Sequence, residues 1–341
     1  MATCCVIGVD LGGTNVRAAA IADDGSFVGP RINNSSEAEK GAEATFEAIA
    51  CTVREAAERA SMTPEAVGIA IPGWVDESSG MVRWSPNFGT WDNGVFHYWV
   101  DVPYRERLEE KLRLPIYAGN DANLAALGEY SFGSGEGRVR CLVMLTLGTG
   151  VGGGVVLSGS SVGGRASGPL LLLGGNKGGA ELGHVVIQHG GPDCTSGEYG
   201  SIEAYCQRDA IVKRATLRLV RGRPSVLREM SGGDFSKVSP KMLAEAADRG
   251  DDLAIEVWTE VGTYLGVGIG SLINTFAPDV FAIGGQIAKA GKWLMEPAVR
   301  TARNVAIPQL FENARIVLAQ QVEDAGLLGA AAWALESTQT R

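Results

Sequence analysis

The sequence has no surplus of basic residues, no long apolar segment and no regular cysteine framework. Its 30 Lys and Arg are outnumbered by 39 Asp and Glu, giving a net charge of −9. Nucleic-acid-binding proteins usually carry a basic surplus, so we expect no DNA or RNA partner. No window of about 18 residues lacks polar breaks, so we expect no membrane partner either. Six cysteines at irregular spacing indicate no disulfides.

The first residues also lack a targeting signal. The segment MATCCVIGVDLGG reaches an acid at Asp10 without a basic stretch, a long apolar core or a cleavage site. Because a secretory signal peptide needs all three, we expect a cytoplasmic protein. At roughly 100–200 residues per domain, 341 residues predict two domains.

Alternating strand and helix patterns run through the chain. Short apolar runs predict strands, and apolar residues spaced at three and four predict helices. The predicted strands are 4–9, 16–21, 67–71, 115–119, 141–147, 155–157, 279–283 and 315–319, and the predicted helices are 37–60, 104–113, 121–130, 201–220, 239–248, 251–276, 292–303 and 326–335. Segments 158–169 and 222–235 interrupt this pattern and are predicted to be surface loops.

A unit of strand, glycine turn and strand occurs twice, at DLGGTN and again at GTGVGGG. The repetition predicts an internally duplicated α/β architecture with a cleft between its halves. We expect a small domain of residues 1–120 plus a C-terminal helix at about 325–341, and a large domain of residues 121–324.

Glycine is the most over-represented residue, with 47 copies against an average share of roughly 7%. Residues 148–153 satisfy G-x-G-x-x-G, but a short β-branched segment follows where a dinucleotide fold needs a helix. No GxxxxGK[ST] motif occurs either. Two glycine hairpins remain, each able to direct backbone N–H groups at an anion. The alternative is that both are plain tight turns without a ligand. That alternative would be preferred for a single glycine turn, but two turns at matching places favour anion binding.

Three polar or glycine clusters accompany the hairpins. Asn120-Asp121 follows a strand and begins a helix, so the carboxylate is either near a ligand or part of an ordinary N-cap. Glu181, His184 and Glu203 form the chain's densest association of histidine with acids. The segment is either a candidate binding site or a solvated turn. The glycines of 283–285 follow a strand and either cradle a phosphate or adenosine or form a plain turn.

Eight motifs, in this order, resemble those of the ROK family of sugar kinases and sugar-responsive repressors, and most closely its glucokinases. They are DLGGTNVR (10–17), PGWVD (72–76), SPNF (85–88), NDAN (120–123), LTLGTGVGGG (145–154), GGAELGH (178–184), CTSGEYGSIE (194–203) and FAIGGQI (281–287). The resemblance implies a duplicated actin-like, ribonuclease H-like two-domain kinase fold, with ATP and sugar meeting in an interdomain cleft, and a homodimer.

The resemblance also implies roles for individual residues. Asp121 occupies the position of the catalytic base, and Asp10 would contact Mg²⁺ through water. The implied sugar-binding set is Gly73, Asn87, Asn120, Asp121, Glu181, His184 and Glu203. The implied nucleotide and phosphate set is Asp10, Gly12, Gly13, Thr14, Asn15, Thr146, Gly148, Thr149, Gly150, Gly284 and Gly285. Carboxylates and amides suit this assignment, because a hexose offers hydroxyls that need such partners.

The sequence departs from the family pattern at a structural zinc site. The family's kinases often carry a His and a C-x-C-G-x-x-G-C motif, whereas Ser196 and Ser201 stand here at two thiolate positions. Serine hydroxyls are poor zinc ligands at neutral pH, so we expect no structural zinc. The alternative is that His184 and Cys194, with His189 or Cys206, hold zinc through a rearranged loop. A second departure is the long 158–173 stretch, whose leucines 170–173 form either a buried strand or a subunit contact.

These observations predict an ATP-dependent hexose kinase that makes glucose 6-phosphate with Mg²⁺. Kinases for N-acetylglucosamine, N-acetylmannosamine, fructose or allose remain alternatives, as do polyphosphate or ADP as donor. A repressor needs a helix-turn-helix ahead of the kinase-like part, but Asp10 lies nine residues from the start and the charge is negative. A sugar binder without turnover is disfavoured by Asp10, Thr14, Asp121 and both glycine loops.

Overall fold

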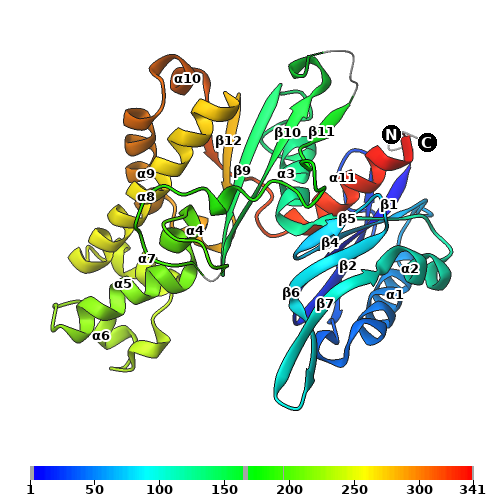
Figure 1. The fold of residues 1–341 in the computed structure, drawn as a ribbon, viewed down its shortest axis with the longest axis horizontal. Helices are drawn as coiled ribbons and strands as arrows, with labels where there is room; N and C mark the ends of the chain where they lie inside the picture. Colours follow the sequence, from blue (N-terminus) through cyan, green and yellow to red (C-terminus); the bar gives the residue numbers. More distant parts are fainter. Residues whose placement is uncertain (1–3, 164–167, 195, 340–341) are drawn as a thin grey trace. The chain divides into compact units, whose positions relative to one another are not determined.

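The computed structural model describes residues 4–163, 168–194 and 196–339. They form two compact units (Figure 1). The first unit comprises the described residues of 1–140, 154–180 and 323–341, and the second comprises those of 141–153 and 181–322. The first unit thus extends past the expected boundary at residue 120.

The first unit is built on a five-stranded sheet of order β3-β2-β1-β4-β8. Its strands are β1 (Cys5–Leu11), β2 (Asn15–Ala22), β3 (Ile32–Ser35), β4 (Val67–Ile71) and β8 (Ile116–Asn120). The first three strands are antiparallel neighbours, whereas β4 and β8 run parallel to β1. The predicted hairpin of β1 and β2 is therefore confirmed.

Helices cover both faces of this sheet. They are α1 (Ala42–Glu58), α2 (Tyr104–Leu112), α3 (Asp121–Phe132) and α11 (Ala325–Gln339). Alternate β1 residues point to opposite faces. Ile7 packs in a core with Phe46 and Ile49 of α1, whereas Val6 packs in a second core with Leu327 of α11. The spacing of the α1 residues at three and four explains why this segment forms a helix with one buried stripe.

Helix α3 belongs to the first unit because it packs tightly on α11. A Cβ atom at Gly128 would lie 2.7 Å from the backbone nitrogen of Gly329, and one at Gly329 would lie 2.1 Å from the carbonyl oxygen of Leu124. Only glycine permits such a close approach of two helix backbones. This contact keeps residues 121–132 with the C-terminal helix.

A three-stranded sheet also lies in the first unit and was not anticipated from the sequence. It consists of β5 (Trp74–Asp76), β6 (Met81–Asp92) and β7 (Val95–Pro103) in the order β5-β6-β7. A two-residue turn at Asn93-Gly94 joins β6 to β7, with φ of 48° and 81° at the two positions. Asn-Gly is the dipeptide that such left-handed hairpin turns favour, so this signal was present in the sequence.

The second five-stranded sheet has the order β11-β10-β9-β12-β13. Its strands are β9 (Cys141–Leu147), β10 (Val151–Ser158), β11 (Pro169–Leu171), β12 (Val280–Gly284) and β13 (Arg315–Leu318). Strand β12 runs parallel to both β9 and β13. A glycine hairpin followed by two parallel strands thus occurs twice, which confirms the predicted duplication. Of the 170–173 leucines, Leu170 and Leu171 lie in β11, which is antiparallel to β10 and half-buried rather than fully buried.

Helices make up most of the second unit. They are α4 (Ile202–Cys206), α5 (Arg208–Val220), α6 (Leu227–Met230), α7 (Pro240–Asp248), α8 (Asp252–Phe276), α9 (Lys292–Val305) and α10 (Pro308–Asn313). The predicted helix 201–220 is broken at Gln207, whose ψ of 158° is extended. Short 3₁₀ turns occupy Ala38–Lys40, Gly159–Ser161, Leu182–His184, Phe235–Lys237 and Gln286–Ala290 across the two units.

The glycines of α8 have a packing role. Added Cβ atoms at Gly262, Gly266 and Gly270 would each come within 2.6 Å of atoms in α9. Close contact between the two helices therefore offsets the roughly 1 kcal/mol of helix propensity that each glycine costs. Among the described helices, none is both long and apolar enough to cross a membrane.

Candidate active site

Two exposed glycine turns connect the paired strands. The N–H of Gly12 donates to the carbonyl of Asn15 at 2.8 Å, and the N–H of Gly148 donates to that of Gly150 at 2.9 Å. Within the described residues, the N–H groups at the tips of the turns, in 13–14 and 149–150, donate to no protein acceptor. Such groups can bind an anion. The predicted phosphate-binding residues of each loop are thus brought together within their own unit, and their phosphate role stays a prediction.

Asp10 lies at the end of β1 and forms an ion pair with Arg17. The Asp10 Oδ2 atom is 2.5 Å from the Arg17 guanidinium, which also donates to the carbonyl of Glu323 at 3.0 Å. A Cβ at Gly326 would lie 2.5 Å from the Asp10 carboxyl carbon, so this carboxylate abuts the first turn of α11. Arg17 and the helix start therefore hold a carboxylate at the carboxyl edge of the sheet.

Asn120 and Asp121 lie at the same edge, because the strand register aligns Asp10 with Ala70 and Ala70 with Gly119. The Asn120 side chain caps α3 by accepting from the N–H of Asn123 at 3.0 Å. An N-cap was one of the two interpretations of Asn120-Asp121 from the sequence. It also donates to the carbonyl of Gly73 at 3.0 Å. Asp121 Oδ1 accepts from the N–H of Ala122 at 2.9 Å.

Gly73 allows this edge to form. Its φ is 107°, and a Cβ there would lie 2.4 Å from the carbonyl oxygen of Trp84. Glycine is therefore required on packing grounds alone. Asn87, also expected to bind sugar, lies on β6, and its side chain is outside the described part of the chain.

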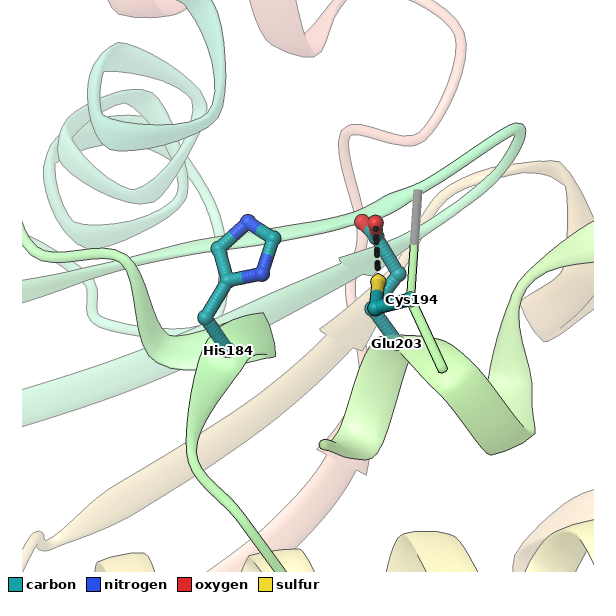
Figure 2. Close-up of side chains that lie close together, drawn as sticks. All are labelled: His184, Cys194 and Glu203. Atoms are coloured by element: carbon teal, nitrogen blue, oxygen red, sulfur yellow. Dashed lines mark hydrogen bonds between the residues drawn. The ribbon is translucent and has the colours of Figure 1, made fainter. Parts of the chain in front are cut away.

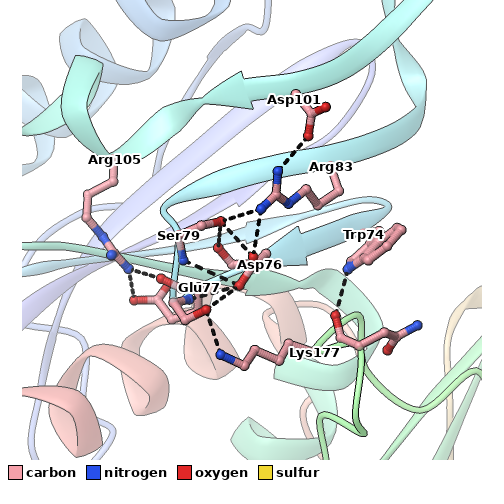
Figure 3. Close-up of polar contacts among 10 residues, drawn as sticks. Trp74, Asp76, Glu77, Ser79, Arg83, Asp101, Arg105 and Lys177 are labelled. Atoms are coloured by element: carbon pink, nitrogen blue, oxygen red, sulfur yellow. Dashed lines mark hydrogen bonds and ion pairs between the residues drawn. The ribbon is translucent and has the colours of Figure 1, made fainter.

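The segment before Glu181 belongs to the first unit, and a polar network within that unit holds it in place (Figure 3). Trp74 Nε1 donates to the carbonyl of Asn176 at 3.2 Å, and Lys177 Nζ donates to Ser78 Oγ at 2.7 Å. Ser78 in turn donates to Asp76 at 2.7 Å. Hydrogen bonds from Ser78 and its neighbours hold the pKa of Asp76 well below its usual range. No role was expected from the sequence for the side chains of this network.

The second unit gathers the predicted histidine and acids. His184 ends a 3₁₀ turn, and its Nε2 atom lies 3.9 Å from Glu181 Oε2. Buried Glu203 accepts from the N–H of Val151 at 2.7 Å and from Cys194 Sγ at 3.1 Å. Figure 2 shows the thiol beneath the Glu203 carboxylate, with the His184 ring beside them. The structure therefore brings His184, Glu181 and Glu203 together and joins them to the residue after the second glycine turn.

Glu198 is the residue of this site that the sequence analysis missed. Its Oε1 atom lies 2.5 Å from His184 Nδ1. Burial lowers the pKa of His184, whereas the hydrogen bond to Glu198 and the surrounding carboxylates raise it to above the usual value. In the sequence, Glu198 is only an acid that follows His184 within the same segment. Nothing in their spacing predicts that the chain turns back and brings the two side chains together.

The donor set at this place does not fit a structural zinc. Ser201 Oγ accepts from the N–H of Ala204 at 3.2 Å and caps α4, so its hydroxyl has a different role. The Cys194 thiol donates to Glu203, and burial raises its pKa. The atoms that remain, from His184, Cys194 and Glu203, lie within 4.8 Å of one another. They supply one thiol, where a zinc of this motif needs three thiolates.

The glycines at the end of β12 are explained by packing. Gly285 has a φ of 84°, and a Cβ there would lie 2.2 Å from the carbonyl oxygen of Leu147. Gly284 pairs with Thr146 of β9, and a Cβ there would lie 2.5 Å from Met144 Cε. A tight turn accounts for both glycines, and their nucleotide role stays a prediction.

Comparison with known proteins places this geometry in a family. Residues 6–337 match the ROK family. The chain belongs to the ROK family. A glucokinase of Thermotoga maritima is 35% identical over 96% of this ROK chain and 96% of its own length. A xylose repressor of Caldicellulosiruptor bescii is 26% identical over 81% of this chain and 65% of its own.

A solved structure shows the same relationship in three dimensions. The ROK family glucokinase of Streptomyces griseus, in complex with glucose and AMPPNP, superposes with a TM-score of 0.79 at 30% identity. The match covers 97% of this ROK chain and 99% of that protein. The expected duplicated actin-like, ribonuclease H-like kinase fold is thereby confirmed, and so is the resemblance on which it rested.

Proposed function

We propose that this ROK protein is an ATP-dependent hexose kinase that phosphorylates glucose to glucose 6-phosphate. The main structural support for this proposal is one hydrogen bond, in which Glu203 Oε2 accepts from the N–H of Val151 at 2.7 Å. Through it, the segment expected to bind sugar is hydrogen-bonded to the glycine turn expected to bind phosphate. Glucose as acceptor is supported by the glucokinases of Thermotoga maritima and Streptomyces griseus, which match this chain over nearly its full length.

The chemistry of the second unit suits a hexose. Glu181 and Glu203 offer carboxylate oxygens that accept hydrogen bonds from hydroxyls, and His184 offers a ring nitrogen on the side facing Glu181. A polyol gains most from such paired acceptors and donors, because each hydroxyl can use both at once. A site that satisfies hydroxyls in this way discriminates strongly against analogues that lack them.

The two glycine turns suit the donor. Their tip N–H groups, which have no acceptor among the described residues, would bind the phosphate oxygens of MgATP. Asp10 lies near the end of β1, the strand that leads into the first turn, and its carboxylate would contact the magnesium ion of the substrate through water. Phosphoryl transfer needs such positioning and charge neutralisation more than covalent help from the protein.

Asp121 is proposed as the general base. It opens α3, where the helix N-terminus favours the ionised carboxylate. In the reaction, the sugar hydroxyl oxygen bonds to the γ-phosphorus, the bond from phosphorus to the bridging oxygen of ADP breaks, and Asp121 accepts the hydroxyl proton. A base of this kind contributes roughly 10²–10⁴-fold to the rate.

The test is a steady-state assay of ADP release with a panel of hexoses, run on wild type, Asp121→Asn and a control, Asp92→Asn. Asp92 is an exposed carboxyl of the same unit in the β6–β7 hairpin. We expect glucose to give the highest kcat/KM, Asp121→Asn to lose at least ~100-fold in kcat with much smaller changes in sugar binding, and Asp92→Asn to match wild type. A kcat above about half of wild type in Asp121→Asn would remove Asp121 from the mechanism.

A further inference from the structure

The imidazole of His184 lies between two carboxylates that contact its two different nitrogens. Glu198 Oε1 is 2.5 Å from Nδ1, and Glu181 Oε2 is 3.9 Å from Nε2. Only the first distance is that of a hydrogen bond. The side chains of His184 and Glu198 are 30% and 28% exposed, so the pair is partly shielded from water.

A tight turn delivers Glu198 to this position. The N–H of Cys194 donates to the carbonyl of Glu198 at 2.7 Å, and the N–H of Gly197 donates to the carbonyl of Cys194 at 3.1 Å. Gly197 has a φ of 99°, a backbone conformation that other residues rarely adopt. The backbone of the turn therefore fixes where the carboxylate lies.

Neighbouring side chains complete the arrangement. Ser196 Oγ lies 3.3 Å from His184 Nδ1 and donates to Cys194 Sγ at 3.4 Å. The thiol in turn donates to Glu203. Hydrogen bonds through Ser196 and Cys194 thus connect the surroundings of the histidine to the buried carboxylate that accepts from the N–H of Val151.

The proton position on a histidine is set by what its other nitrogen contacts. A carboxylate can only accept when ionised, so a carboxylate at Nδ1 keeps a proton there. Although burial raises the pKa of Glu198, hydrogen bonds from Ser196 and His184 lower it to about 2, so the carboxylate is ionised at neutral pH. In neutral His184 the lone pair is then on Nε2.

We propose that Glu198 is a positioning residue that replaces a structural metal: it holds His184 with a proton on Nδ1 and presents Nε2 to the sugar. The part about the sugar rests on the proposed function, whereas the tautomer and the absence of zinc do not. Loss of the hydrogen-bond partner behind a metal-ligating histidine typically costs 10–100-fold in metal affinity or activity, and we expect an effect of the same order for the partner of His184.

The primary test reads the wild-type protein by NMR after labelling histidine with ¹⁵N. The chain has only three histidines, at 97, 184 and 189, so His97→Gln and His189→Gln assign the remaining signal. At a pH above the imidazole pKa, we expect His184 Nδ1 to be protonated and Nε2 unprotonated, with far less than one zinc per chain by elemental analysis. A proton on Nε2 with bare Nδ1, or stoichiometric zinc that survives dialysis, overturns the proposal.

A variant pair tests the role of Glu198 itself. Glu198→Ala should move the His184 proton toward Nε2 and raise the KM for sugar about 10–100-fold, with the KM for ATP within twofold of wild type. Tyr199→Phe is the matched control, because Tyr199 Oη contacts His189 rather than His184 in the same loop. An unchanged tautomer in folded Glu198→Ala overturns the proposal. If no sugar is phosphorylated by wild type, the proposed function fails, while the NMR and zinc results still decide the tautomer and the metal.

Discussion

A side chain at Gly148 should weaken ATP binding while leaving the fold intact. An added Cβ there meets no protein atom closer than the carbonyl oxygen of Gly150 at 4.0 Å, and the φ of Gly148 is not in the left-handed region. The protein alone can therefore accommodate Gly148→Val. The valine would, however, fill space next to the tip of the turn, where the proposal places the phosphates.

The size of the effect follows from the hydrogen bonds that would be lost. A hydrogen bond to a charged partner is worth about 1.5–3 kcal/mol, and each 1.4 kcal/mol changes an affinity about tenfold. Loss of one bond from a tip N–H to a phosphate oxygen should raise the KM for ATP about 10- to 100-fold. The KM for sugar should change by less than about threefold, because no Glu203 atom is among those within 4 Å of a Cβ added at Gly148.

The assay measures both KM values and the melting temperature of Gly148→Val. Gly163→Val is the control, since a Cβ added at Gly163 has no atom of the described residues within 4 Å and lies outside both glycine turns. We expect unchanged melting temperatures in both variants and a raised KM for ATP only in Gly148→Val. Equal weakening of ATP and sugar, or of sugar alone, would refute the assignment of this turn to the donor.

Two further predictions concern the metal and pH. A strong chelator should leave the melting temperature unchanged without substrates, because we expect no structural zinc that contributes to folding. EDTA should abolish activity, and excess Mg²⁺ should restore it fully. The pH prediction compares the melting temperatures of wild type and Glu198→Ala from pH 3 to 9. The lowered pKa of Glu198 adds stability above about 4.5 that is lost as pH falls, and the raised pKa of His184 adds stability below about 6.5 that is lost as pH rises. The difference should therefore be largest between those values, and a difference that grows toward pH 9 would contradict the ion pair.

Much of the fold could be predicted because local patterns agree with it. A helix was expected at 251–276, and α8 forms there, with Gly262, Gly266 and Gly270 packed against α9. The break at Gln207 was missed because the apolar pattern continues across it. The β6–β7 hairpin was missed although Asn93-Gly94 marks its turn.

The extent of the first unit and the role of Glu198 could not be predicted for a different reason. Both depend on contacts between two segments of the chain, and the spacing of residues along the sequence does not predict that these segments come together. Helix α3 stays with the first unit because Gly128 and Gly329 let two helices touch, and Glu198 reaches His184 because Gly197 adopts a left-handed conformation. The roles proposed for Asp121 and the glycine turns came from the family resemblance and stay predictions, whereas the partners of His184 could be identified only in the structure.

As a glucose kinase, the protein would transfer the γ-phosphoryl group of ATP to the 6-hydroxyl of glucose. The most direct measurement is ³¹P NMR of purified protein incubated with glucose and MgATP, with the phosphorylated carbon identified by its coupling to phosphorus. The account predicts ADP and glucose 6-phosphate in equal amounts, and neither above background with Asp121→Asn over the same time. ADP accompanied only by inorganic phosphate, or no ADP at all with glucose, would contradict it.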